Sequence, residues 1–136
     1  MTLSEAILAR HSVRAYTDRP IEGTTLTTLQ RKIACYIAIG YGETQGVSHR
    51  IKSPSEVSNA DGSTPEWFND GVDAALLAPT AVNQQKFHFE YLRASDGKDK
   101  VVAKKGVSLL GYTQMDLGIA KYHFEIGAGV ENFIWK

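Results

Sequence analysis

Residues 65–93 read PEWFNDGVDAALLAPTAVNQQKFHFEYLR, and this run joins a helical pattern to an alternating one. Its first part, Pro65 to Leu77, predicts a helix: Thr64 can cap it, Pro65 suits the first turn, and acidic side chains near its start suit the positive end of the helix dipole. Pro79 then ends the helix, because proline cannot donate the next backbone hydrogen bond. The run therefore predicts one helix followed closely by another element.

The second part of the run, Lys86 to Arg93, has the pattern of a strand. Phe87, Phe89 and Tyr91 alternate with polar neighbours, which predicts a strand with one buried face. Residues 95–97 read Ser-Asp-Gly, a typical turn, so a hairpin with a strand over Lys100–Lys104 is expected.

Further elements are predicted outward from this run, with periodicity as the main signal. In chain order they are a helix over Thr2–Arg10, extended chain over His11–Tyr16, a helix after Pro20, a buried strand over Ala34–Gly40, a long loop over Glu43–Thr64 with a helical turn at Ser53–Val57, and a helix over Met115–Gly127. In the last helix Leu117, Ala120 and Phe124 face inward. The length of 136 residues favours a single domain over residues 1–136.

The overall composition excludes several classes of protein. Hydrophobic residues make up 43% and charged residues 22%, which is ordinary for a globular protein and too apolar for a disordered chain. Lys and Arg together number 15, as do Asp and Glu, so a net charge of zero counts against sequence-independent nucleic-acid binding and a polybasic membrane anchor.

Cysteine content and the N-terminal residues bear on location. Cys35 is the single cysteine, so no intrachain disulfide can form, and a reducing compartment fits best. Residues 1–10 lack the apolar core of a signal peptide, and no apolar run is long enough to span a bilayer. We therefore expect a cytoplasmic protein.

Three short segments carry side chains suited to ligand binding. Residues 10–14 (Arg-His-Ser-Val-Arg), with Tyr16, place two guanidiniums and a hydroxyl within reach of one anion. Residues 40–42 (Gly-Tyr-Gly) make a permissive turn, after which residues 48–52 (Ser-His-Arg-Ile-Lys) bring two cations. Residues 78–85 (Ala-Pro-Thr-Ala-Val-Asn-Gln-Gln) supply a hydroxyl and three carboxamides that can read the donors and acceptors of a heterocycle.

Each segment also has an ordinary structural explanation. Arginines at a helix C-terminus commonly serve the helix dipole and solvent, glycines commonly end a strand, and Pro79 with Asn83 can make a turn. The joint presence of all three segments is what favours a binding site. The four histidines are scattered without metal-ligand spacing, so no metal site is expected.

Together the three segments resemble the flavin-binding motifs of the nitroreductase family. The Arg-x-Ser-x-Arg-x-Tyr pattern, the Gly-Tyr-Gly segment with basic residues after it, and Ala-Pro-Thr-Ala-Val-Asn-Gln-Gln carry the resemblance. In most members the last motif comes early, whereas here it follows Gly-Tyr-Gly, an order that resembles one branch known from anaerobic bacteria. The closing segment, Asp116–Ala128, also resembles that branch. The implied fold is α+β and nitroreductase-like, with a small mixed or antiparallel sheet flanked by helices.

The resemblance implies a set of FMN-binding residues and leaves the catalytic residues unassigned. Arg10, Ser12 and Arg14 would hold the phosphate and ribityl chain, Arg50 or Lys52 would approach the phosphate, and Thr80, Asn83 and Gln85 would hydrogen-bond the ribityl chain or the isoalloxazine edge. The implied activity passes electrons from NAD(P)H through FMN to nitroaromatic or quinone-like acceptors. Family flavin sites lie at a homodimer interface, so a homodimer is implied.

One departure from the family pattern supports an alternative. Residues 30–34 run almost directly into residues 35–39, where family proteins have a central helical block that supplies much of the dimer core and part of the flavin pocket. The alternative is a non-catalytic shortened protein that self-associates or sequesters flavin. A third possibility is that two chains exchange segments and rebuild what each lacks, which predicts a dimer that does not dissociate on dilution.

Overall fold

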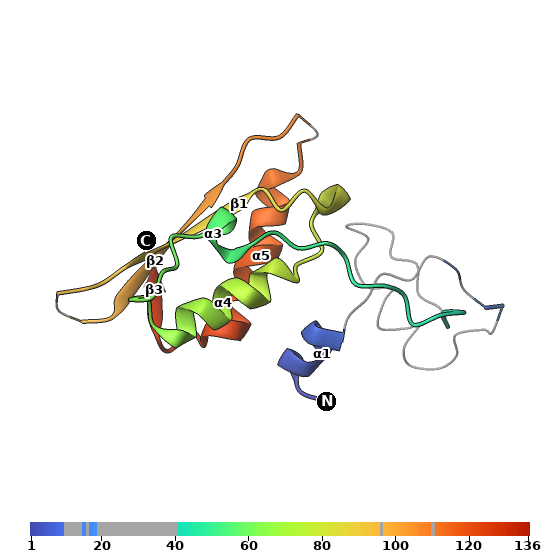
Figure 1. Cartoon of the computed structure of the whole chain (residues 1–136), viewed down its shortest axis with the longest axis horizontal. Coiled ribbons are helices and arrows are strands. Elements are labelled where there is room, and N and C mark those ends of the chain that lie inside the picture. Colours follow the sequence, from blue (N-terminus) through green and yellow to red (C-terminus); the bar gives the residue numbers. More distant parts are fainter. Residues whose placement is uncertain (10–14, 16, 19–40, 96, 110) are drawn as a thin grey trace, which may run out of the picture. The chain divides into compact units, whose positions relative to one another are not determined.

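The computed structural model describes residues 1–9, 15, 17–18, 41–95, 97–109 and 111–136 (Figure 1). Its elements are α1 (Leu3–Ala9), α3 (Pro54–Val57), α4 (Glu66–Leu76), the 3-10 turn η1 (Ala81–Asn83), β1 (Phe87–Leu92), β2 (Asp99–Lys105), α5 (Thr113–Ala128) and β3 (Phe133–Trp135). Every helix or strand predicted within these ranges is present, with ends that shift by a few residues.

The chain divides into two units, Met1–Arg10 with Arg50–Lys136, and His11–His49. Within the second unit, the Thr17 N–H donates to the Tyr41 carbonyl (2.7 Å) and the Glu43 N–H donates to the Ala15 carbonyl (3.2 Å). The predicted extended chain over His11–Tyr16 falls mostly outside the described residues. The predicted helix after Pro20 and the predicted strand over Ala34–Gly40 fall wholly outside them.

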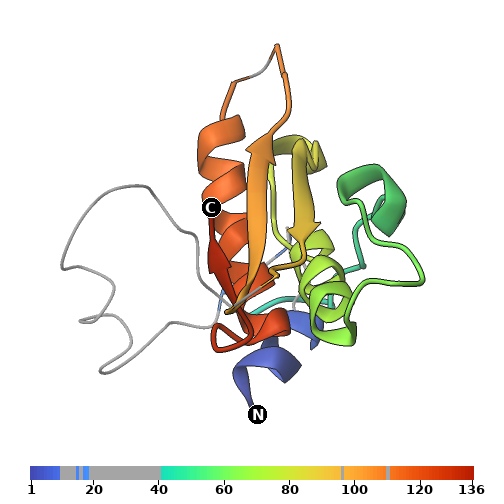
Figure 2. The same cartoon turned by 90° about the vertical axis from the view of Figure 1, so that its left-hand side faces the viewer.

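The sheet has three strands in the order β1-β2-β3 and is mixed, as the α+β prediction expected (Figure 2). β1 and β2 form the predicted antiparallel hairpin, with Phe87 opposite Lys105 and Leu92 opposite Lys100. β3 pairs with β2 in parallel, starting with Asp99 opposite Phe133. The sequence did not predict β3, because three residues at a chain end give no usable periodicity.

On the side of β1 away from β2, the described residues Ser58 and Asn59 pair with the strand. The Asn59 backbone N–H donates to the Phe89 carbonyl (3.2 Å), and Ser58 forms an isolated parallel bridge with Phe89. The Asn59 carboxamide then accepts from the Tyr91 N–H (2.8 Å) and donates to the Tyr91 carbonyl (3.2 Å). One side chain thus makes the two hydrogen bonds that the backbone of a neighbouring strand would make.

Helix ends follow the local sequence, with one correction. In α1 the Thr2 hydroxyl accepts from the Glu5 N–H (3.2 Å) and the Glu5 carboxylate accepts from the Thr2 N–H (2.6 Å), a reciprocal cap. The prediction that Thr64 caps α4 is wrong: Pro65 is the N-cap residue. The Thr64 hydroxyl instead donates to the Asp61 carbonyl (2.7 Å), and this bond closes the turn before the helix.

The core lies where α5 and α4 pack together and α5 covers one face of the sheet (Figures 1 and 2). Leu117, Ala120 and Phe124 of α5 are buried, as predicted. Phe124 lies among four other rings, with centroid distances of 4.7 Å to Phe89, 5.4 Å to Phe133, 5.5 Å to Phe68 and 5.6 Å to Trp135. Aromatic packing therefore joins both helices to β1 and β3, with Phe133 and Trp135 taking part from β3.

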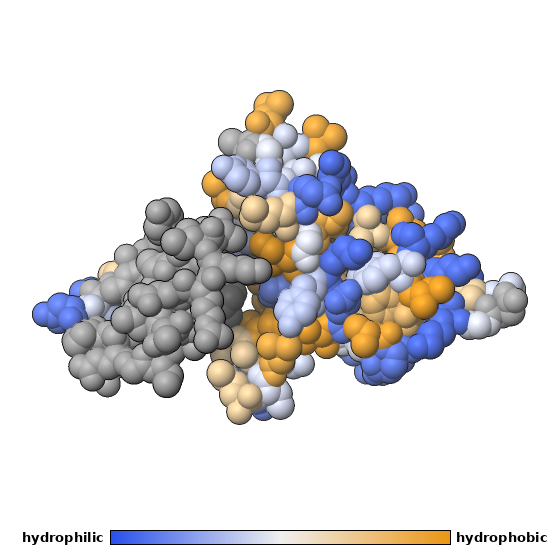
Figure 3. Space-filling model, turned by 180° about the vertical axis from the view of Figure 1, so that it is seen from behind, coloured by the Kyte–Doolittle hydropathy of each residue, from blue (hydrophilic) through white to orange (hydrophobic). Residues whose placement is uncertain are grey.

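Apolar side chains are also exposed on the connection between β2 and α5. Val107 and Leu109 there are 89% and 104% exposed, and orange residues gather at the same end of the molecule in the space-filling view (Figure 3). In the described ranges, none of the helices has the length and apolar character needed to cross a membrane.

Candidate functional site

The loop between α4 and β1 has an unusual backbone. Val82, Asn83 and Gln85 have positive φ angles of 45°, 56° and 45°. Such angles are uncommon for any residue with a side chain and are a clear outlier for a β-branched valine. Each costs roughly 1–3 kcal/mol unless its surroundings hold it, and strain of this kind clusters at functional sites.

Hydrogen bonds within the loop hold part of this conformation. The Thr80 hydroxyl, which is buried, accepts from the Gln85 N–H (3.0 Å). The Thr80 carbonyl accepts from the Asn83 N–H (2.9 Å) and the Ala81 carbonyl from the Gln84 N–H (3.0 Å). Thr80 therefore lies beneath the loop and supports it.

The carboxamides of the loop reach across to the segment Arg50–Lys52. The Arg50 carbonyl accepts from Asn83 Nδ2 (2.7 Å) and from Gln85 Nε2 (2.8 Å). Gln85 Oε1 accepts from the Lys52 N–H (3.0 Å), and the Gln85 carbonyl accepts from Lys52 Nζ (2.8 Å). Gln85 is 2% exposed, so its carboxamide is largely removed from water, and the four bonds together hold the two segments against each other.

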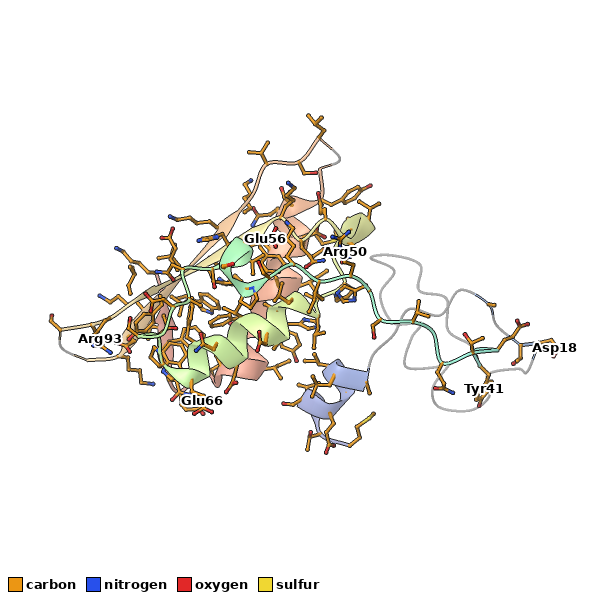
Figure 4. The ribbon with its side chains drawn as sticks, in the orientation of Figure 1. Asp18, Tyr41, Arg50, Glu56, Glu66 and Arg93 are labelled. Atoms are coloured by element: carbon orange, nitrogen blue, oxygen red, sulfur yellow. The ribbon has the colours of Figure 1, made fainter. Side chains whose placement is uncertain are left out.

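These contacts form the wall of a pocket of about 310 Å³. It is lined by Arg50, Ile51, Lys52, Glu56, Asn83 and Gln85. Figure 4 labels Glu56 in α3 and Arg50 on the segment that leads into this helix. Four of the eight residues predicted for FMN binding thus meet at one pocket. Thr80 lies behind the lining, and Arg10, Ser12 and Arg14 lie outside the described residues.

Glu56 was not predicted as part of this site. The backbone N–H and hydroxyl of Ser53 each donate to its carboxylate at 2.9 Å, and these bonds lower the pKa of Glu56, with smaller contributions from Lys52 and Arg50. Glu56 is therefore ionised at neutral pH. Two cations and one anion give the lining a net charge of +1, which favours an anionic ligand.

We predict that Ser53→Ala raises the pKa of Glu56 part of the way toward 4.5, its ordinary value, because the variant loses the hydroxyl bond and keeps the backbone bond. A lowered pKa stabilises the folded state above the unfolded pKa, and this contribution is lost as the pH falls through the folded pKa. An NMR titration of the Glu56 carboxyl measures the change. Ser55→Ala is the control, since the Ser55 hydroxyl contacts that of Ser53 and makes no bond to Glu56. An unaltered Glu56 titration in Ser53→Ala would contradict the prediction.

The chemistry of the site is that of anion binding. Arg50 and Lys52 supply positive charge, and Asn83 keeps one amide hydrogen beyond the bond to Arg50. Both amide hydrogens of Gln85 are already donated, to the Arg50 carbonyl and to Asn83 Oδ1 (2.8 Å). Across the described ranges, no group of three or more His, Cys, Asp or Glu side chains is placed to hold a metal ion.

Comparison with known proteins gives two matches. A family model described as "Putative TM nitroreductase" matches residues 30–128, a range that includes all four predicted residues at the pocket. The crystal structure of a "putative nitroreductase" from Thermotoga maritima MSB8 is similar over 93% of this chain and 83% of that chain, with a TM-score of 0.66. Because the two sequences are 16% identical, this likeness concerns the fold alone. No curated protein matches the chain.

Proposed function

The chain belongs to the nitroreductase family, and from this premise we propose that it is an FMN-binding oxidoreductase. In this proposal it takes electrons from NAD(P)H and passes them to a nitroaromatic or quinone-like acceptor. The observation that carries the proposal is the meeting of Arg50, Lys52, Asn83 and Gln85 at one pocket, since these residues come from two sequence motifs that resemble those of flavin-binding relatives.

The donor set of the pocket fits the phosphate end of FMN. A guanidinium donates in a planar fork that matches phosphate oxygens, and an ammonium adds a second positive charge. Asn83 can donate its remaining amide hydrogen to a ribityl or phosphate oxygen, whereas Gln85 and Thr80 hold the loop in place. When bound, FMN would supply the acceptor for hydride and the donor of electrons.

The size of the pocket bears on how much of the cofactor it can enclose. A volume of about 310 Å³ is at the small end of the range for ligand sites, roughly 300–1,000 Å³. The pocket suits a phosphate with part of a polyol chain, and the flavin ring would extend beyond it. We propose that a second copy of the chain covers the ring, in a homodimer of the kind that the family resemblance implies.

The visible spectrum tests the proposal. The purified protein is mixed with FMN, freed of excess ligand and scanned, and retained flavin at about one equivalent per chain supports it. A colourless protein that is folded by circular dichroism would overturn it. The loaded protein is then assayed for NADH oxidation with a nitroaromatic. Retained flavin without turnover would favour the flavin-sequestering alternative.

We predict that Lys52→Ala weakens FMN binding at least about tenfold, because a charge-assisted hydrogen bond contributes roughly 1.5–3 kcal/mol. The variant keeps the backbone bond from residue 52 to Gln85, so the loop retains that support. Lys98→Ala is the matched control, since it removes the same charge from the β1–β2 turn, which does not line the pocket. Fluorescence titration of FMN measures both dissociation constants. An equal loss of FMN affinity in the two variants would mean that the net charge of the protein, and not a contact at Lys52, determines binding.

A further inference from the structure

Asp116 lies in the first turn of α5, and its carboxylate contacts the strained loop before β1. Oδ1 accepts from the Ala81 N–H (2.9 Å), and Oδ2 accepts from Gln84 Nε2. The residue is 2% exposed and does not line the pocket. Its two acceptors are therefore directed at the loop alone.

Among the described residues, no basic side chain forms an ion pair with Asp116. The start of α5 favours an anion, and two hydrogen bonds compensate part of the cost of desolvation. A buried carboxylate of this kind is a poor way to gain stability, because a well-packed apolar residue often serves at least as well. We therefore look for the role of Asp116 in the loop geometry that its hydrogen bonds fix, rather than in stability.

That geometry extends to the pocket through two sets of hydrogen bonds. Asp116 fixes Ala81 and Gln84, which lie on either side of the residues with positive φ, Val82 and Asn83. Asn83 in turn donates to the Arg50 carbonyl, and Gln85, two residues further on, donates to the same carbonyl. Hydrogen bonds thus connect the Asp116 carboxylate, through the loop, to the segment Arg50–Lys52 that carries both cations.

We propose that Asp116 is a positioning residue, which sets the geometry of the pocket lining and thereby its affinity for the phosphate of FMN. The identity of the ligand, FMN, rests on the proposed function. The role of Asp116 in positioning the pocket lining does not depend on it.

The neighbouring Gln84 makes the inference specific. Gln84 Oε1 is buried and has no hydrogen-bond partner among the described residues. In Asp116→Asn, the new carboxamide keeps an oxygen for the Ala81 N–H. If the Gln84 amide also turns over, the new NH₂ group can donate to Oε1, and the exposed 3.2 Å bond from Gln84 Nε2 to the Gly111 carbonyl is given up in exchange. Asp116→Ala offers neither bond and leaves the Ala81 N–H without its acceptor. Asparagine should therefore preserve the site, and alanine should not.

Amide hydrogen exchange, followed by NMR without flavin, provides the first test. The Lys52 N–H donates to Gln85 Oε1 and the Gln85 N–H to Thr80 Oγ1, so both amides report on the loop. We expect both to exchange at least about tenfold faster in Asp116→Ala, and to be unchanged in Asp116→Asn. The control is Val101→Ala, a buried residue of β2 that pairs with Tyr91, toward the end of β1 away from the loop. This substitution should lower the overall stability of the fold without speeding the exchange of these two amides more than that of other core amides.

The dissociation constant of FMN, measured where every variant is folded by circular dichroism, provides the second test. We expect at least about tenfold weaker binding in Asp116→Ala and wild-type binding in Asp116→Asn and Val101→Ala. Unchanged exchange and affinity in Asp116→Ala would overturn the inference, as would equal losses in the alanine and asparagine variants. If the wild type does not bind FMN, the proposed function fails. The exchange experiment then still decides whether Asp116 positions the lining.

Discussion

Phe124→Ala is expected to destabilise the fold by about 3–5 kcal/mol, the usual cost of removing a fully buried phenylalanine. Its side chain has no exposed surface and lies against rings from α4, β1 and β3. Alanine would leave a cavity where the two helices and the sheet meet, and the stacked contact with Phe89 at 4.7 Å would be lost. Urea unfolding followed by circular dichroism measures the change.

Tyr122→Ala is the matched control for this experiment. Tyr122 lies on the same helix with 57% of its surface exposed, so its removal should change the free energy of unfolding by less than about 0.5 kcal/mol. If Phe124→Ala cost no more than Tyr122→Ala, the ring cluster would not be the centre of the core.

Gly127→Ala is the second substitution with a large expected effect. A Cβ at this position would press on the Asp70 carbonyl oxygen and lie 2.7 Å from the Ala74 Cβ, so α4 and α5 would have to separate. Backbone atoms cannot move aside cheaply, and overpacking of this kind costs about 1–3 kcal/mol and occasionally more. We expect a loss at or above the upper end of that range, measured by urea unfolding.

Gly118→Ala is the same substitution on the same helix without the close approach. A Cβ there would meet nothing within 4 Å, so only the helix propensity changes. Alanine should stabilise the fold by about 0.5–1 kcal/mol at this position. Opposite signs for the two variants are the expected result. Losses of similar size would mean that glycine is needed at both positions for some other reason.

The parts of the fold that the sequence predicted are those with a strong local pattern. The alternation of Phe87, Phe89 and Tyr91 predicted β1, and the Ser-Asp-Gly turn predicted its pairing with β2. Strand β3 was missed, because its stability comes from parallel pairing and ring packing with distant residues. The N-cap of α4 was misplaced, because the Thr64 hydroxyl has a second possible partner in the turn before it.

In the candidate site, too, local patterns identified the segments but not the long-range contacts between them. Residues 48–52 and 78–85 were singled out as separate segments, and the structure brings them together through Asn83 and Gln85. Asp116 was missed as part of this assembly, because an acidic residue in the first turn of a helix already has an ordinary explanation in the helix dipole. Its contact with Ala81 joins positions 35 residues apart, which no local pattern reveals.

The pairing of Asn59 with β1 has a consequence for the behaviour of the protein in concentrated solution. A strand whose outer N–H and C=O groups are unpaired can recruit a strand from another molecule, which is the first step of edge-to-edge aggregation. Here the Tyr91 N–H and carbonyl are both occupied by one carboxamide, and the Phe89 carbonyl is occupied by the backbone of the same residue. The short segment Ser58–Asn59 thereby occupies the outer edge of β1 at Phe89 and Tyr91, where another strand would otherwise pair.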